Sequence, residues 1–286
     1  MLAKHCKMCK TQEEQIKIVK MITLLLPDDV EQYIADFRKK PLDNDSIRWA
    51  VKNHFKGGDD KKAMEKVYCN IKYWDTSQVT NMSSLFKHNR DFNDDISRWD
   101  TSKVMNMEYM FHCAATFNQP IGVWDTSKVY TMKHMFSYAT MFNQPIGEWD
   151  TSRVTCMMYT FEMANKFNQP IGKWNMSNVT GMSYMFHNAM NFNQPIGDWD
   201  TSRVLYMRCM FWHTYSFNQP IGTWNTSNVM TMSYMFHHAK KFNKDISEWK
   251  TSSVLDMSYM FFGADDFKQD ISRWNMSNVE ITREMF

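Results

Sequence analysis

The chain has 286 residues and is unusually rich in Met (27), Phe (20), Tyr (12) and Trp (11), with only 9 Gly and 7 Pro, which suggests a repeated motif. Its 33 basic residues nearly balance its 31 acidic residues, so the net charge of +2 argues against a nucleic-acid partner or an acidic membrane surface. No apolar run approaches the roughly 18 residues of a membrane-spanning helix, which argues against an integral membrane protein.

The chain begins with a segment of helical pattern. Apolar spacing predicts a helix from about residue 11 to residue 25, which Pro27 ends, and Asp28 and Asp29 suit the N-terminus of a second helix. The apolar stretch before Pro27 is too short for a secretory signal. We therefore expect the chain to stay inside the cell, while association with a cell surface or a virion stays open.

Two more helices are expected before the repeats begin. Ser46 is suited to cap a helix over residues 47–55, and Gly57-Gly58 separates this helix from another at about 60–68. We assign residues 1–73 to a small all-α region whose later half covers the first repeat.

Two short motifs in this region suggest functions. The segment LLLPDDVEQYIADF (24–37) is similar to the opening of an F-box, although an amphipathic helix packed on its neighbour is the favoured explanation. Cys6 and Cys9 beside His5 provide half of a zinc site, and the other half is missing unless Cys69 and His54 fold back to it. We expect free thiols there, and neither a metal nor a cofactor.

From Trp74 onward the sequence repeats every 25 residues. One copy reads W-[DN]-[TM]-S-x-V-x-x-M-x-x-M-F-x-x-A-x-x-F-N-Q-P-I-G-x, and eight full copies (74–273) precede a half copy (274–286). The period is set by nine tryptophans, which are Trp74, Trp99, Trp124, Trp149, Trp174, Trp199, Trp224, Trp249 and Trp274.

Each copy is expected to form one short strand and one short helix. Ser102-x-Val104 favours a strand, while the spacing of Met107, Met110, Phe111 and Ala114 is that of one apolar helical face. Because a single copy cannot bury this face alone, stacked copies should share one continuous core. The prediction is an α/β repeat solenoid, resembling leucine-rich repeats, over residues 74–286.

Polar positions of the repeat are expected to be structural. Asn118, Asn143 and their equivalents can satisfy backbone groups at a buried corner. Glu148, Lys173 and Asp198 precede successive tryptophans, which predicts a ladder of charges along a solvated edge.

Segments such as NVTGMSYMFHNA (178–189) and FNQPIGDWDTSRV (192–204) resemble the BspA-like family of 25-residue leucine-rich-repeat-related proteins. SIRWAVKNHF (46–55) and VYCNIKYWDTSQVTNMSSLF (67–86) are similar to the entry segment of such proteins. The resemblance implies a solenoid with a surface or interaction role and no catalytic activity. No nucleotide-binding, zinc-protease or serine-hydrolase motif is present, and we expect the chain not to be an enzyme.

An aromatic stripe is the main candidate for binding. With the methionines inward, a helical wheel turns Tyr109, His112 and their equivalents outward. These rings either bind a protein partner or only stack along the repeats. His213, His237 and His238 also suggest a cluster sensitive to metal or pH, although no carboxylate or thiolate accompanies them. The candidate partner-binding residues are Tyr184, Trp212, His213, Tyr234, His237, His238, Tyr259 and Phe262.

We therefore expect a non-enzymatic protein–protein interaction scaffold whose protein partner is unknown. The alternatives are an F-box-like substrate adaptor for a ubiquitin ligase and a structural component of a virion or cell-surface assembly. The half copy at 274–286 carries no dedicated cap, so end-to-end self-association through it is possible.

Overall fold

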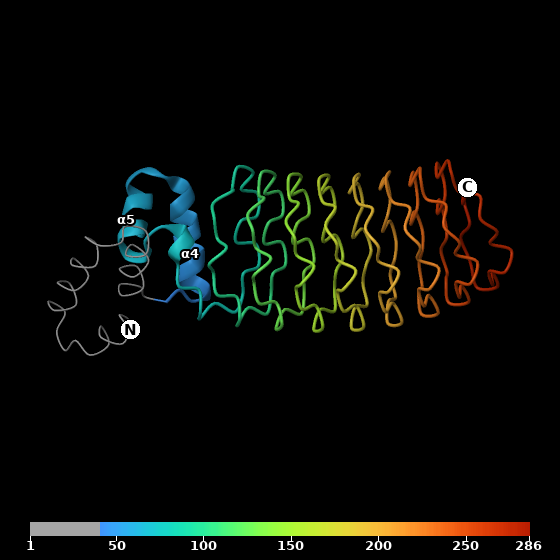
Figure 1. The fold of residues 1–286 in the computed structure, drawn as a ribbon, viewed down its shortest axis with the longest axis horizontal. Helices are drawn as coiled ribbons and strands as arrows, with labels where there is room; N and C mark the ends of the chain where they lie inside the picture. The colour runs from blue at the N-terminus through green and yellow to red at the C-terminus, as the bar shows by residue number, and fades with distance from the viewer. Residues whose placement is uncertain (1–40) are drawn as a thin grey trace.

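The computed structural model describes residues 41–286, and the 25-residue copies form a row of stacked layers in it. Two helices lie at the N-terminal end of the row and the C-terminus lies at the other end (Figure 1). Each layer begins at one repeat tryptophan and ends before the next. Residues that occupy the same place in successive layers form a column.

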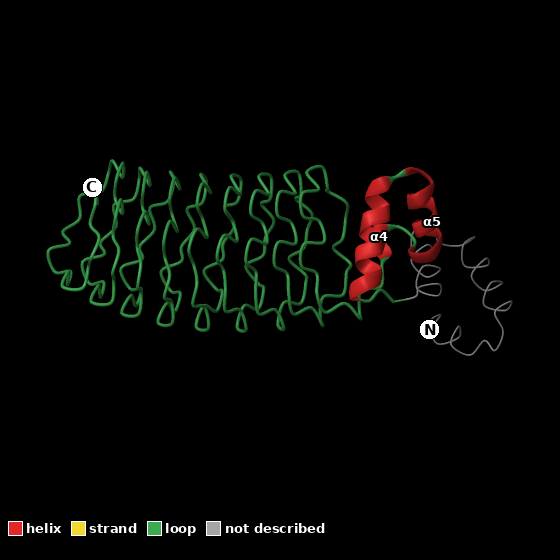
Figure 2. Cartoon of the chain, turned by 180° about the vertical axis from the view of Figure 1, so that it is seen from behind, coloured by secondary structure: helices red, strands yellow, loops and turns green. Residues whose placement is uncertain are grey.

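The expected alternation of strand and helix is wrong. Over the part of the chain that the structure describes, helices occur only before the first layer: α4 (Asn44–Lys56), α5 (Gly58–Tyr68) and the 3-10 turn η1 (Ile71–Tyr73). Figure 2 accordingly draws every layer as loop. Adjacent layers meet through single parallel β-bridges, from Asn81↔Asn106 to Asp256↔Ile281, without a continuous strand. The α/β solenoid is thus replaced by a repeat architecture of stacked turns.

Hydrogen bonding explains why residues 107–114 are not helical. Here the N–H groups of Tyr109 and Phe111 donate to carbonyls of the next layer at 3.0 and 2.9 Å. The N–H of Met110, between them, donates to the carbonyl three residues earlier at 3.2 Å. An α-helix would direct all of these groups four residues back. The predicted apolar face is nevertheless buried, because successive turns place the same side chains inward.

Two columns in each layer adopt left-handed backbone. Tyr109 (φ 57°) and Cys113 (φ 61°) are examples, and the same region recurs in their columns without glycine in most layers. This conformation costs a non-glycine residue about 1–2 kcal/mol. The N–H groups of both residues donate to the next layer, at 3.0 and 2.8 Å, and these bonds offset the strain.

The core is a set of aromatic ladders. Phe186 is fully buried, lies 3.9 Å from Phe192 of its own layer between ring centroids, and stacks on Phe161 and Phe211 of the adjacent layers at 5.7 Å. Each repeat tryptophan from Trp99 to Trp274 donates its Nε1–H to the carbonyl of the isoleucine 28 residues before it, at 2.8–3.3 Å. The indoles therefore line up one above another.

Polar ladders complete the contacts between layers. Asn143 Oδ1 accepts the backbone N–H of Asn168 at 2.9 Å, and the equivalent bond recurs along the column, which confirms the predicted role of these asparagines. Lys173 pairs with Glu148 at 2.7 Å on the solvated edge, as predicted. A Cβ on Gly172 would lie 2.6 Å from the Pro195 carbonyl oxygen of the next layer, so this close approach requires glycine.

Helix α4 binds the open face of the first layer. It starts earlier than expected, because Asp43 is its N-cap and Ser46 closes the capping box from the third helical position. In later layers the N–H in the column of Thr80 donates to a carbonyl of the layer before it. In the first layer Asn44 Oδ1 takes the place of that carbonyl and accepts the Thr80 N–H at 2.9 Å.

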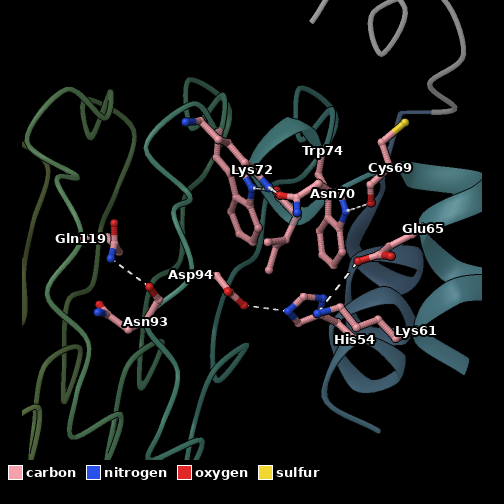
Figure 3. Close-up of polar contacts among 12 residues, drawn as sticks. His54, Lys61, Glu65, Cys69, Asn70, Lys72, Trp74, Asn93, Asp94 and Gln119 are labelled. Atoms are coloured by element: carbon pink, nitrogen blue, oxygen red, sulfur yellow. Dashed lines mark hydrogen bonds and ion pairs between the residues drawn. The ribbon is translucent and has the colours of Figure 1, made fainter. Parts of the chain in front are cut away.

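Side chains from the end of α4 extend this contact (Figure 3). Buried His54 pairs with Asp94 at 2.7 Å, and its hydrogen bond holds the pKa of the Asp94 carboxyl below the usual value. The ring of Phe55 meets Phe92 edge-on at 5.7 Å. Trp74, which has no earlier layer to bond, donates its Nε1–H to the Cys69 carbonyl at 3.3 Å.

Some predictions fall outside the described residues: the helix at 11–25, the helix opened by Asp28-Asp29, the F-box-like segment 24–37 and the Cys6/Cys9 pair. Within residues 41–286, neither helix has the length and apolar character needed to cross a bilayer.

Candidate interaction surface

The eight predicted partner-binding residues lie together across four consecutive layers. We call this set the aromatic surface. Trp212 lies at its centre, with ring centroids 5.5 Å from Tyr234 and 5.4 Å from His237. His213 contacts Trp212. In the next layers Tyr259 stacks on Tyr234, and Phe262 contacts His237 and His238. Tyr184 joins the set through His187, whose ring lies 5.7 Å from Tyr184 and 4.6 Å from Trp212.

Part of this stripe is engaged in stacking along the repeats. The rings of Tyr109, His134, Tyr159 and Tyr184 stack face to face with centroid distances of 4.2–4.5 Å. Cys209, which is buried, interrupts this column. The alternative in which the rings only stack along the repeats therefore describes the layers before Cys209, where each ring covers its neighbours.

Beyond Cys209 the rings around Trp212 are tilted, while Tyr234 and Tyr259 stack at 4.7 Å. Trp212 meets His187, Tyr234 and His237 at interplanar angles of 30–52°, and Phe262 is 37% exposed. The Trp212 Nε1–H is buried and has no hydrogen-bond partner. Half-exposed rings in irregular contact provide a broad apolar surface with polar atoms at its edge.

Two residues that the sequence analysis missed belong to this surface. Arg208 donates its Nε–H to the Tyr184 hydroxyl at 3.3 Å and lies 5.4 Å from the Tyr234 ring centroid. Tyr215 places its hydroxyl 3.3 Å from His213 Nδ1. Burial and the Cys209 side chain raise the pKa of Tyr184 to about 12, so its hydroxyl stays protonated. Both residues occupy columns that vary between copies, and only their neighbours in space mark them.

A second exposed apolar row was also missed. Each member directly follows the buried valine of its layer. Because neighbouring side chains of extended backbone point in opposite directions, this position beside the valine was the signal for an outward side chain. The row consists of Met105, Tyr130, Met230 and Leu255, which are 39–48% exposed.

A buried carboxylate lies near the middle of the stack. Glu162 accepts the Ser137 hydroxyl at 2.8 Å and lies 3.4 Å from His187 Nδ1 and 3.9 Å from His134 Nδ1. Burial lowers the pKa of His134 to about 4, although Glu162 acts in the opposite direction. His134 is therefore neutral at pH 7.

This histidine should make stability depend on pH. An imidazole with a pKa of about 4 when folded and about 6.5 when unfolded binds its proton first in the unfolded chain, so stability falls as the pH drops from 6.5 to 4. Replacing His134 by the tyrosine usual in its column should reduce the loss of unfolding free energy between pH 7 and 4.5 by about 1–2 kcal/mol, after solvent screening. Urea unfolding at each pH measures this.

Replacing Tyr159, the next ring of the same stack, with Phe provides the matched control. Because burial raises the pKa of Tyr159 above its usual value near 10, this change removes no group that titrates between pH 4.5 and 7 and should leave the pH dependence unchanged. Parallel stability curves for the parent and His134→Tyr would contradict the assignment.

Ligand-forming side chains come together at two places in residues 41–286. His213, His237 and His238 form one group, as their columns predicted, and His88, His112 and Cys113 form the other. In each group the candidate ligand atoms lie within 4.8 Å of one another.

Stacked copies, inter-layer ladders and a surface built from equivalent columns define a repeat protein. The comparison with protein families agrees, because one family model matches three overlapping segments, 51–157, 144–229 and 216–286. The chain belongs to this family, DUF285, described as Mycoplasma protein of unknown function. That description does not include the relation to leucine-rich repeats that the resemblance implied. No curated protein and no solved structure matches the chain.

Proposed function

We propose that this repeat protein is a non-enzymatic scaffold that binds a protein partner through the aromatic surface. The observation that carries the proposal is the cluster around Trp212, where tilted rings from four consecutive layers form one half-exposed patch. Tryptophan, tyrosine and arginine are the residues most enriched where binding energy concentrates in protein interfaces.

The rigidity of the stack supports this role. Tyr234 and Tyr259 are carried on backbone whose N–H groups donate to the next layer at 2.9 Å. Side chains held in place before binding lose little conformational entropy when a partner arrives. Arg208 adds a cation at the edge, where it can bind a carboxylate of the partner.

The chemistry of the surface favours binding over catalysis. Burial raises the pKa of Cys209 to about 11, so its thiol stays protonated and is a poor nucleophile at neutral pH. The rings around it provide contact area and hydrogen bonding.

The test begins with affinity capture from the natural source, followed by measurement of the dissociation constant for the purified partner. Replacing Trp212 and Tyr234 together by Ala should weaken binding by about 30-fold or more, the effect of losing at least 2 kcal/mol at a central contact. The matched control replaces Met230 and Leu255 of the second apolar row together by Ala. Met230 lies in the same layer as Tyr234 and Leu255 lies in the next layer, and this variant should leave binding unchanged.

Equal affinity of the Trp212/Tyr234 variant and the parent would rule out this surface. Loss of binding in the Met230/Leu255 variant would assign the partner to the second row instead. Recovery of ubiquitin-ligase subunits would favour the adaptor alternative, and recovery of one dominant structural protein would favour the assembly alternative.

A further inference from the structure

We propose that His213, His237 and His238 form a binding site for a divalent transition metal ion of the zinc type. His213 belongs to one layer, and His237 and His238 belong to the next. Their ring centroids are 4.5–6.0 Å apart, and one nitrogen of each lies within 4.8 Å of the others. The inference is independent of the proposed scaffold role, because it concerns a ligand that the chain binds by itself.

The same arrangement occurs twice in the stack. His88, His112 and Cys113 lie 125 residues, or five layers, before His213, His237 and His238, so both triads use the same three places of the repeat. The four intervening layer pairs each lack at least two of these ligands, since their columns contain residues such as Tyr138, Met163 and Asn188. The triads are therefore departures from the repeat consensus that share one geometry.

Backbone geometry fixes the spacing of the ligands. His213 and His238 have left-handed backbone, with φ of 57° and 54°, and each donates its N–H to the next layer at 2.8 Å. The side chains of this column thus project from equivalent points about 4.8 Å apart, the separation of hydrogen-bonded chains. Tyr215, whose hydroxyl lies 3.3 Å from His213 Nδ1, contacts the first ring and helps to orient it.

A glycine makes room for the third ligand. Gly263 follows His238 in the same column, where the other described layers carry a side chain. A Cβ at Gly263 would collide with His238 Nδ1. The imidazole of His238 therefore occupies the space that a side chain would fill.

One candidate ligand atom of the cluster has no partner in the protein. Nδ1 of His237 is buried without a hydrogen-bond partner. Because a buried polar atom is costly when it is left unpaired, coordination of an ion in the cluster would satisfy a group that the chain itself leaves unsatisfied.

Three imidazole ligands favour Zn²⁺, Cu²⁺ or Ni²⁺ over Mg²⁺ or Ca²⁺, which prefer oxygen ligands. In a tetrahedral zinc site the nitrogens lie about 2.0–2.1 Å from the ion, and hence about 3.4 Å apart. Binding therefore requires side-chain rotations that bring the nitrogens, now within 4.8 Å of one another, to this separation. The fourth position is left for water or for an added ligand.

Zinc titration by calorimetry tests the proposal on the full chain with Cys6→Ser, Cys9→Ser and Cys113→Ser, which remove competing thiols. This parent should bind one Zn²⁺ at the histidine triad. Replacing His237 by Ser, which occupies that column as Ser137, should weaken zinc binding about 100-fold. Replacing His213 by Asn, which adopts the same left-handed backbone as Asn188, should do the same.

His187→Ser is the matched control, because His187 shares the column of His237 and lies outside the triad. This variant should change the zinc affinity by less than about 3-fold.

Thermal unfolding in the presence of a chelator separates metal binding from folding, since all three variants should unfold near the parent temperature without zinc. An absence of zinc binding in the parent, or unchanged affinity in both His237→Ser and His213→Asn, would overturn the proposal.

Restoring Cys113 tests the repeated geometry. The chain should then bind a second equivalent of metal, and Co²⁺ at this site should show the thiolate-to-metal absorption that a nitrogen-only site lacks. Unchanged stoichiometry on restoring Cys113 would rule out the second site and the argument drawn from the shared positions.

Discussion

Deleting residues 149–173 should leave a folded protein, whereas deleting residues 149–161 should break the stack. The first deletion removes one whole layer and joins Glu148 to Trp174, so every column and the pattern of backbone hydrogen bonds between layers are restored across the junction. The second removes about half a layer and puts Glu162 where a repeat tryptophan belongs. Because stability in such an array comes from contacts between neighbours, a mismatched junction loses these contacts on both sides.

Circular dichroism with thermal unfolding and limited proteolysis measures the difference. The whole-layer deletion should unfold in one transition a few degrees below the parent, and the partial deletion should unfold in two steps and be cleaved at the junction. Similar destabilisation by both deletions would show that the layers are not equivalent units.

Replacing Phe186 by Ala should lower the free energy of unfolding by about 3–5 kcal/mol, the range for a fully buried Phe. Its ring is completely buried and contacts Phe192 in its own layer as well as Phe161 and Phe211 on either side. Its loss therefore leaves a cavity that touches three layers at once, and the rigid ladder limits how far the neighbours can close it.

Phe286 occupies the same column at the end of the row and is 68% exposed, with one stacked neighbour, Phe261, at 5.6 Å. Replacing Phe286 by Ala should change the free energy of unfolding by about 0.5 kcal/mol or less. Urea denaturation of both variants gives the comparison, and equal losses would contradict the core as described.

The interior of the layers was largely predictable from the sequence. Met107, Met110, Phe111 and Ala114 are all buried, and the asparagine column bonds the backbone as expected. Both predictions depend only on which residues recur every 25 positions. The backbone conformation was not predictable in this way, since a spacing of three and four residues suits successive turns as well as a helix.

The candidate site was likewise predictable only in part. The repeat columns predicted that His213, His237 and His238 lie together, because a column fixes which side chains are one layer apart. The contacts of Arg208 with Tyr184 and of Tyr215 with His213 were missed. These contacts depend on how long side chains lie across the surface, and no period in the sequence records that direction.

The sequence by itself determined the 25-residue layer, its apolar interior and the alignment of equivalent residues, because burial of recurring large side chains permits only one register. The tertiary structure alone decided that the layers are built from turns. The hydrogen-bond acceptors of alternate N–H groups, such as the Met135 carbonyl for Phe111, belong to the next copy and exist only once the copies are stacked.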